Sequence, residues 1–188
     1  MPHDHHHHHR FPTWAHKALL LNPTRKLTNN PDKMLGPHVR PGMTVFEPGP
    51  GLGWFTLPLA RMVGPQGRVV VVEVEPTVLE GLKKRARKAG LLDRLDCRLG
   101  DAAHSLDDLE GSVDFAPLMH ILHEIADLEV FLAGLAKAMK PGAKAVVLEP
   151  KGPVDQARFQ AELDLCARAG LAVESSEPGK FQAVLVKS

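Results

Sequence analysis

The sequence has only two cysteines, no tyrosine and no long apolar run, and these shortages exclude several classes of protein. Cys97 and Cys166 lie far apart and form no CxxC motif, so we expect neither a disulfide framework nor a cysteine-ligated metal site. No apolar stretch approaches the roughly 20 residues that span a bilayer, and the first residues contain no apolar signal-peptide core. We therefore expect a cytoplasmic protein that does not insert into a membrane.

The chain also lacks an excess of charge of either sign, which limits the partners it can attract. Its formal charge of +1 creates no global field toward nucleic acid or an anionic membrane. The basic run at residues 83–88 is best explained as the solvated face of a helix. We expect a small-molecule partner held at a defined site, no nucleic acid and no metal, and a monomer or homodimer.

The length fits one folded unit. With 188 residues, of which 44% are hydrophobic, the chain can close one sizeable core. Six of its eleven histidines, His3 and His5 to His9, lie at the start, either as a purification tag or as a native metal-binding tail. We divide the chain into this tail (residues 1–10), a helical lead-in or lid (11–42) and one domain (43–188).

Short apolar runs alternate with segments of helical period along that domain. This alternation is typical of a parallel β-sheet with covering helices. The strands are expected at residues 43–47, 68–73, 95–99, 112–116 and 143–149. The helices are expected at residues 54–63, 77–89, 102–109 and 128–139. A further helix at 154–169 and two strand-like runs, 171–176 and 181–187, predict a hairpin at one edge of the sheet.

The first strand is followed by a glycine-rich turn, Glu47-Pro-Gly-Pro-Gly-Leu-Gly53. Gly49, Gly51 and Gly53 allow a tight turn and the close approach of a ligand, because none of them has a Cβ. Their GxGxG spacing differs from the GxGxxG of dinucleotide-binding turns. Glu47 would repel a pyrophosphate but attract an ammonium group. The turn therefore favours a cofactor with an amino-acid end over a dinucleotide.

Two further acidic positions follow the next strands. Glu73 ends the valine run, where its carboxylate could accept hydrogen bonds from a ribose, and Val74 could pack on an adenine. Glu75 is the competing candidate, and an exposed acid at a strand end is the structural alternative. Asp101 could accept a hydrogen bond from an adenine amino group beside Ala102, or simply cap the next helix.

Taken together, the sequence resembles the class I S-adenosylmethionine-dependent methyltransferases. The resemblance runs from about Met43 to Ser188 and rests on four motifs in order: VFEPGPGLG, VVVVEVEP, GDA and MKPGAKAVVLEP. It implies a three-layer, Rossmann-like α/β fold whose seven strands follow the order 3-2-1-4-5-7-6, with strand seven antiparallel. The segments LNPTRKLTNNPDKMLGPHVRPGMTV and HILHEIADLEVFL are loosely similar to methyltransferases of quinone biosynthesis.

The resemblance also implies roles for individual residues. S-adenosylmethionine is the expected cofactor and S-adenosylhomocysteine the expected product. Leu118 begins the segment that the fold would place beside the cofactor's methyl group. The residues expected to bind the cofactor are Glu47, Gly49, Pro50, Gly51, Gly53, Glu73, Val74, Asp101, Ala102 and Leu118.

The catalytic candidates lie after the fourth strand. If this segment is helical, His120, His123 and Glu124 share one face, so a carboxylate could orient a histidine. A capping and packing role is the alternative for both histidines. Glu149 could orient a substrate, or be a strand-end acid without a partner. Trp14, after Phe11, could close over an apolar substrate or bury the N-terminal helix.

These observations predict an enzyme that methylates a small molecule. A dedicated base is optional for such a reaction, because the cofactor already carries an activated carbon. The alternative from another class is a non-catalytic module that binds the cofactor on the same fold. A dinucleotide-dependent dehydrogenase is disfavoured by the glycine spacing and by Glu47.

Overall fold

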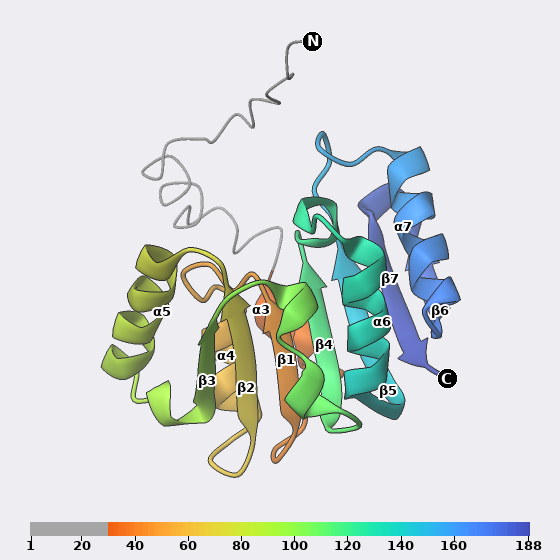
Figure 1. The fold of residues 1–188 in the computed structure, drawn as a ribbon. Coiled ribbons are helices and arrows are strands. Elements are labelled where there is room, and N and C mark those ends of the chain that lie inside the picture. Colours follow the sequence, from red (N-terminus) through yellow and green to blue (C-terminus); the bar gives the residue numbers. More distant parts are fainter. Residues whose placement is uncertain (1–29) are drawn as a thin grey trace.

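The protein forms a seven-stranded sheet in a computed structural model that describes residues 30–188 (Figure 1). The strand order is β3-β2-β1-β4-β5-β7-β6, and β7 runs antiparallel to both neighbours, as the resemblance implied. The strands are β1 (Thr44–Pro48), β2 (Arg68–Glu73), β3 (Leu95–Leu99), β4 (Val113–Met119), β5 (Met139–Leu148), β6 (Leu171–Glu177) and β7 (Gln182–Lys187). The parallel strands β1 to β5 all end at one edge of the sheet, where ligands of open α/β folds bind.

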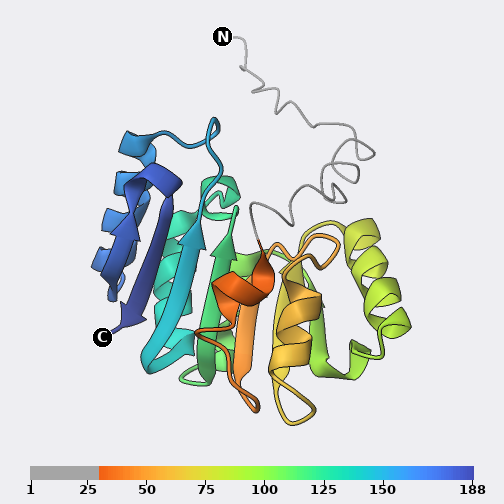
Figure 2. The same ribbon diagram turned by 180° about the vertical axis from the view of Figure 1, so that it is seen from behind.

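Helices cover both faces of the sheet. The helices are α3 (Pro31–Leu35), α4 (Thr56–Met62), α5 (Pro76–Lys88), α6 (Leu128–Ala138) and α7 (Gln156–Arg168), with 3₁₀ turns η1 (Leu92–Arg94), η2 (Ala102–His104), η3 (Asp107–Leu109), η4 (Leu122–Glu124) and η5 (Pro178–Lys180). One face carries α6 and α7, and the opposite face carries α3 and α4 (Figure 2). Within residues 30–188, no helix is both long and apolar enough to cross a bilayer.

Each face of the sheet has its own hydrophobic core. The valines of β2 divide between them: Val70 and Val72 join the cluster under α6 and α7, while Val69 and Val71 join the cluster under α3, α4 and α5. A strand buried on both faces has no polar alternation, which explains the continuous valine run. β2 accordingly lies inside the sheet, between β1 and β3.

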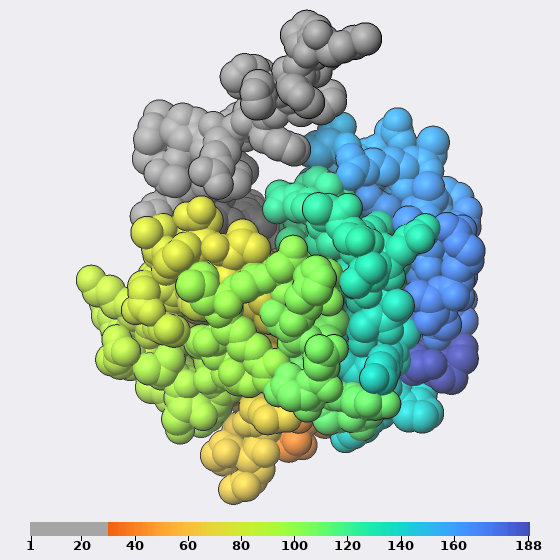
Figure 3. Space-filling model, viewed as in Figure 1, coloured from red at the N-terminus to blue at the C-terminus, as the bar shows by residue number. Residues whose placement is uncertain are grey.

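The prediction of a helix at residues 102–109 was wrong, because this segment forms the two 3₁₀ turns η2 and η3. Asp101 caps η2 by accepting a hydrogen bond from the Ala103 amide at 2.8 Å, and the Ser105 hydroxyl donates back to the Asp101 carbonyl at 2.7 Å. Such local bonds compete with a regular helix. The space-filling view shows this segment packed beside α6 (Figure 3).

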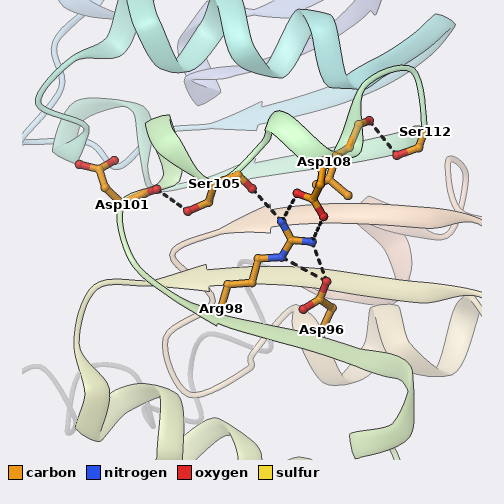
Figure 4. Close-up of polar contacts among 7 residues, drawn as sticks. Asp96, Arg98, Asp101, Ser105, Asp108 and Ser112 are labelled. Atoms are coloured by element: carbon orange, nitrogen blue, oxygen red, sulfur yellow. Dashed lines mark hydrogen bonds and ion pairs between the residues drawn. The ribbon is translucent and has the colours of Figure 1, made fainter.

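Arg98 on β3 holds the same segment in place (Figure 4). Its guanidinium donates to Asp96 at 2.8 Å, to the Ser105 carbonyl at 3.0 Å and to Asp108 at 2.6 Å. The planar fork of arginine suits such simultaneous bonds. Arg98 thereby links the edge strand to the loop that carries Asp101.

Two strand boundaries also differ from expectation. β4 continues to Met119, and β5 begins at Met139 rather than at residue 143. Met139 pairs with Val113, and regular pairing resumes only at Lys144 after an irregularity. The intervening Pro141 has no amide hydrogen, and Gly142 has a φ of 76°, which together explain the irregularity within the strand.

Leu135→Ala should lower the free energy of unfolding by about 2–5 kcal/mol, because Leu135 lies on the fully buried face of α6 and its truncation leaves a cavity. Urea unfolding measures the change. Val130→Ala on the same helix is the matched control, since Val130 is 44% exposed and should change the value by less than about 0.5 kcal/mol. Equal losses in the two variants would contradict this core assignment.

Candidate functional site

A cavity of about 680 Å³ opens at the carboxyl ends of the parallel strands. Its volume lies within the roughly 300–1,000 Å³ of small-molecule sites. The turns after β1, β2, β3 and β4 contribute to its lining, so segments far apart in the sequence meet there. Of the residues predicted for the site, the lining includes Glu47, Gly49, Pro50, Gly51, Glu73, Val74, Asp101, Ala102, His120 and His123.

The glycine turn is held from two sides. The Gly49 amide donates to the Val72 carbonyl of β2 at 2.9 Å, and Arg85 of α5 donates to the Leu52 carbonyl at 2.6 Å. Gly49 and Gly51 have φ values of 62° and 53°, which side chains with a Cβ adopt only at a cost. A Cβ on Gly49 would lie 2.6 Å from Cδ1 of Ile121.

Gly53, predicted to bind the cofactor, lies outside the lining of this cavity. A Cβ there would lie 2.5 Å from Cδ1 of Leu82 on α5. Its φ of 83° turns the chain into α4. Gly53 therefore allows the turn to pack against α5 and contributes to the ligand site only indirectly.

Glu47 places a buried carboxylate at the inner wall of the cavity. Its exposure is 3%, and no described residue hydrogen-bonds to its Oε2. Burial raises the pKa of Glu47 to about 7, against the smaller lowering effect of the Thr56 hydroxyl. An uncompensated buried acid beside an open cavity is a suitable partner for a cationic ligand group.

The part of the cavity that Glu73, Val74 and Asp101 line offers a different chemistry from the part around Glu47. Glu73 lines it, and burial raises the pKa of this carboxylate while the Glu75 amide donates to its Oε1 at 3.1 Å. Val74 is 65% exposed, which is unusual for a large apolar side chain, and Asp101 lies beyond it in the lining. These residues fit a ligand with a cationic amino group at one end and a ribose and flat base at the other.

The segment after β4 does not form the expected helical face. His120 has a φ of 57° and its amide donates to the Leu148 carbonyl at 2.6 Å, so the chain turns sharply before η4. His123 Nδ1 lies within hydrogen-bonding distance of Oε2 of Glu149, just after β5, whereas its Nε2 lies 3.7 Å from Glu124. The principal carboxylate partner of His123 is therefore Glu149, not Glu124.

Glu149, predicted to orient a substrate, lies behind the cavity wall. Its side chain is fully buried, does not line the cavity, and accepts hydrogen bonds from the Ile121 and Leu122 amides at 3.1 and 3.0 Å. Leu118, predicted to bind the cofactor, lies inside β4 in the hydrophobic core and outside the cavity lining. Trp14 lies outside the described residues, as do Phe11 and the histidine-rich start.

Sequence reasoning did not single out the apolar side chains that line the cavity. They include Trp54, Phe55, Met119, Ile121, Ile125, Pro150 and Pro153. Ile121, Ile125 and Pro150 lie within segments quoted for the resemblance, but no local signal separates an apolar residue of the cavity wall from one of the core. Across residues 30–188, no group of three or more histidine, cysteine or acidic side chains is arranged to hold a metal ion.

Comparisons with known proteins agree with this geometry. Residues 46–147 match the family model described as a methyltransferase domain. The chain is 28% identical over 116 residues to the ubiquinone/menaquinone biosynthesis C-methyltransferase UbiE of Enterobacter sp. (strain 638), covering 62% of this chain but 46% of that protein. It is 32% identical over 111 residues to an uncharacterized 37.1 kDa protein in transposon Tn4556 of Streptomyces fradiae, covering 59% of this chain and 31% of that protein.

A solved structure shows the same fold. The crystal structure of an S-adenosylmethionine-dependent methyltransferase from Aquifex aeolicus superposes with a TM-score of 0.79 at 24% identity, covering 94% of this chain and 98% of that one. The curated relatives are longer, and this chain matches less than half of their length.

Glu47→Gln should stabilise the ligand-free protein at about pH 8 and leave its stability nearly unchanged at about pH 5. A pKa raised from 4.5 to about 7 means that stability is lost as the pH rises through this interval, by up to roughly 3 kcal/mol. Glutamine keeps the shape without the charge. Urea unfolding at both pH values measures the difference, and Glu80→Gln on exposed α5 is the control. A pH-independent effect of Glu47→Gln would refute the buried charge.

Proposed function

The chain belongs to the family of methyltransferase domains, in the class that uses S-adenosylmethionine, and we propose that it methylates a small-molecule acceptor. The observation that carries the cofactor assignment is the buried Glu47 carboxylate beside the open glycine turn. Its Oε2, which has no hydrogen-bond partner among residues 30–188, would attract the ammonium group of an amino acid and repel a pyrophosphate. When bound, S-adenosylmethionine supplies a methyl carbon activated by an attached sulfonium.

The cofactor half of the cavity offers a partner for each part of this molecule. Glu47 would bind the ammonium group, and the turn at Gly49, Pro50 and Gly51 would receive the rest of the amino-acid end. Glu73 would accept hydrogen bonds from the ribose hydroxyls. The residues proposed for the adenine are Val74, Asp101 and Ala102.

The acceptor would occupy the remaining half, toward η4 and the β5 end. Apolar side chains dominate there, including Ile121, Ile125 and Pro153, with His120 and His123 among them. Such a lining favours a small, largely apolar molecule held by few polar groups. The names of the similar UbiE proteins, which describe C-methyltransferases of quinone biosynthesis, support an acceptor of this size.

Calorimetric titration with S-adenosylmethionine tests this function directly. We expect binding, together with transfer of a labelled methyl group to the small-molecule extract of cells. Binding without transfer would indicate a non-catalytic module, and absence of binding would refute the assignment.

Glu73→Ala should weaken S-adenosylmethionine binding by about 1–3 kcal/mol, because it removes acceptors for the ribose hydroxyls. This loss corresponds to a roughly 5- to 150-fold higher Kd in calorimetry. Glu80→Ala on the exposed face of α5 should leave the Kd unchanged. Equal Kd values for Glu73→Ala and the unmodified protein would exclude Glu73 from the cofactor site.

Gly49→Ala should lower both stability and cofactor affinity. Its φ of 62° makes a Cβ unfavourable by about 1–2 kcal/mol, and the added atom collides with Ile121 at the cavity wall. Gly42→Ala is the matched control, since Gly42 has a φ of 86° but open space around it. Urea unfolding should detect both variants, whereas calorimetry should show weakened binding only for Gly49→Ala. Weakened binding in both would mean that backbone strain alone explains the effect.

A further inference from the structure

We propose that His123 is the general base of this site, which removes the proton that the methyl group replaces on the acceptor, and that Glu149 fixes the tautomer of His123. This inference rests on the proposed methyl transfer and adds the residues that move the proton. It differs from the expected pairing within one helix, because the base and its partner come from different elements. Glu149 is a positioning residue, since it does not reach the cavity.

The two ring nitrogens of His123 have different surroundings. Nδ1 contacts Oε2 of Glu149, whose side chain is fully buried. His123 itself lines the cavity, and its Nε2 lies on the side of Glu124, which also lines it. A carboxylate accepts hydrogen bonds, so Glu149 favours a proton on Nδ1 and leaves the Nε2 lone pair for the acceptor.

Neighbouring groups hold this pair rigidly. Oε1 of Glu149 accepts hydrogen bonds from the Ile121 and Leu122 amides, which fixes the carboxylate to the same loop that carries His123. Arg158 of α7 donates to the His123 carbonyl at 2.8 Å and to Glu162 at 3.2 Å. Glu149 therefore has its acceptor positions occupied by one loop, which fits a positioning role and not a substrate contact.

In the proposed step, X denotes the nucleophilic atom of the acceptor. The X–H bond breaks, its proton moves to Nε2 of His123, and the electron pair stays on X. That pair forms the new bond to the methyl carbon as the carbon–sulfur bond breaks, and sulfur keeps the bonding pair. The positive charge of the sulfonium is thereby replaced by that of the imidazolium, which Glu149 stabilises.

The charges around His123 set the direction of its pH dependence. Hydrogen bonding to Glu149 raises the pKa of His123, and Glu124 of η4 acts in the same direction. Burial and Arg158 of α7 oppose this effect, while Glu162 on α7 is itself a buried acid whose pKa is raised. The basic form of His123 therefore increases as the pH rises through a value above 6.5, and methyl transfer should increase with it.

Nitrogen-15 NMR of the His123 ring tests the tautomer without any acceptor. In the full chain with S-adenosylhomocysteine, the neutral ring should carry its proton on Nδ1 and titrate at Nε2 with a midpoint above 6.5. In Glu149→Gln, the amide oxygen can still accept from Ile121 and Leu122, but its NH₂ group would donate to Nδ1. The proton should then move to Nε2 and the midpoint should fall. A neutral ring protonated on Nε2 in the unmodified protein would overturn the proposal.

Transfer of labelled methyl groups to a small-molecule extract tests the chemical role. His123→Gln and Glu149→Gln should each lower the rate by roughly 100-fold or more, with cofactor Kd values within about twofold of the unmodified protein. His104→Gln, at an exposed histidine outside the cavity lining, is the matched control and should retain the rate. Unchanged transfer in His123→Gln would overturn the proposal. If the unmodified protein does not bind the cofactor, the proposed function is refuted, while the NMR result still decides the tautomer of His123.

Discussion

The left-handed glycine turn at the end of β1 is the constraint on which the functional site depends. It brings the backbone beside the cavity and leaves no side chain in the space that a ligand needs. The Gly49 amide bonds to β2 and Arg85 bonds to the Leu52 carbonyl, so sheet and helix hold the turn together. The same turn leaves Glu47 buried beside the cavity, where no cation from residues 30–188 pairs with it. This arrangement is unfavourable for the ligand-free protein and favourable for binding.

The fold was predictable where burial is symmetrical and the connections are regular. The range of β2 matches its prediction, and its valines show why: a strand covered on both faces is a continuous apolar run. Residues 102–109 could not be predicted in the same way, because Asp101, Ser105 and the distant Arg98 replace helical bonds with side-chain bonds. The start of β5 depends on pairing with Val113, which a local pattern does not reveal.

One part of the site was predictable from the sequence and the other was not, because only one part depends on local sequence. The part proposed for the cofactor depends on one turn and on acidic residues that directly follow strands, so short motifs reveal it. The other part depends on His123 and Glu149, which lie 26 residues apart and meet through the ends of neighbouring strands. Gly53 stands in the glycine motif but packs against Leu82 of α5, so a motif position is not always a position in the cavity lining.

The pH dependence of ligand binding tests most directly the proposal that the buried Glu47 carboxylate receives the ammonium group of S-adenosylmethionine. Calorimetric titration with S-adenosylhomocysteine, which has the same amino-acid end, should give an affinity that rises between about pH 5.5 and 7.5. Below about pH 7 the loss should approach tenfold per pH unit, because only ionised Glu47 attracts the ammonium group. Glu47→Gln should bind weakly and lose this pH dependence. Equal, pH-independent binding by both proteins would contradict the account.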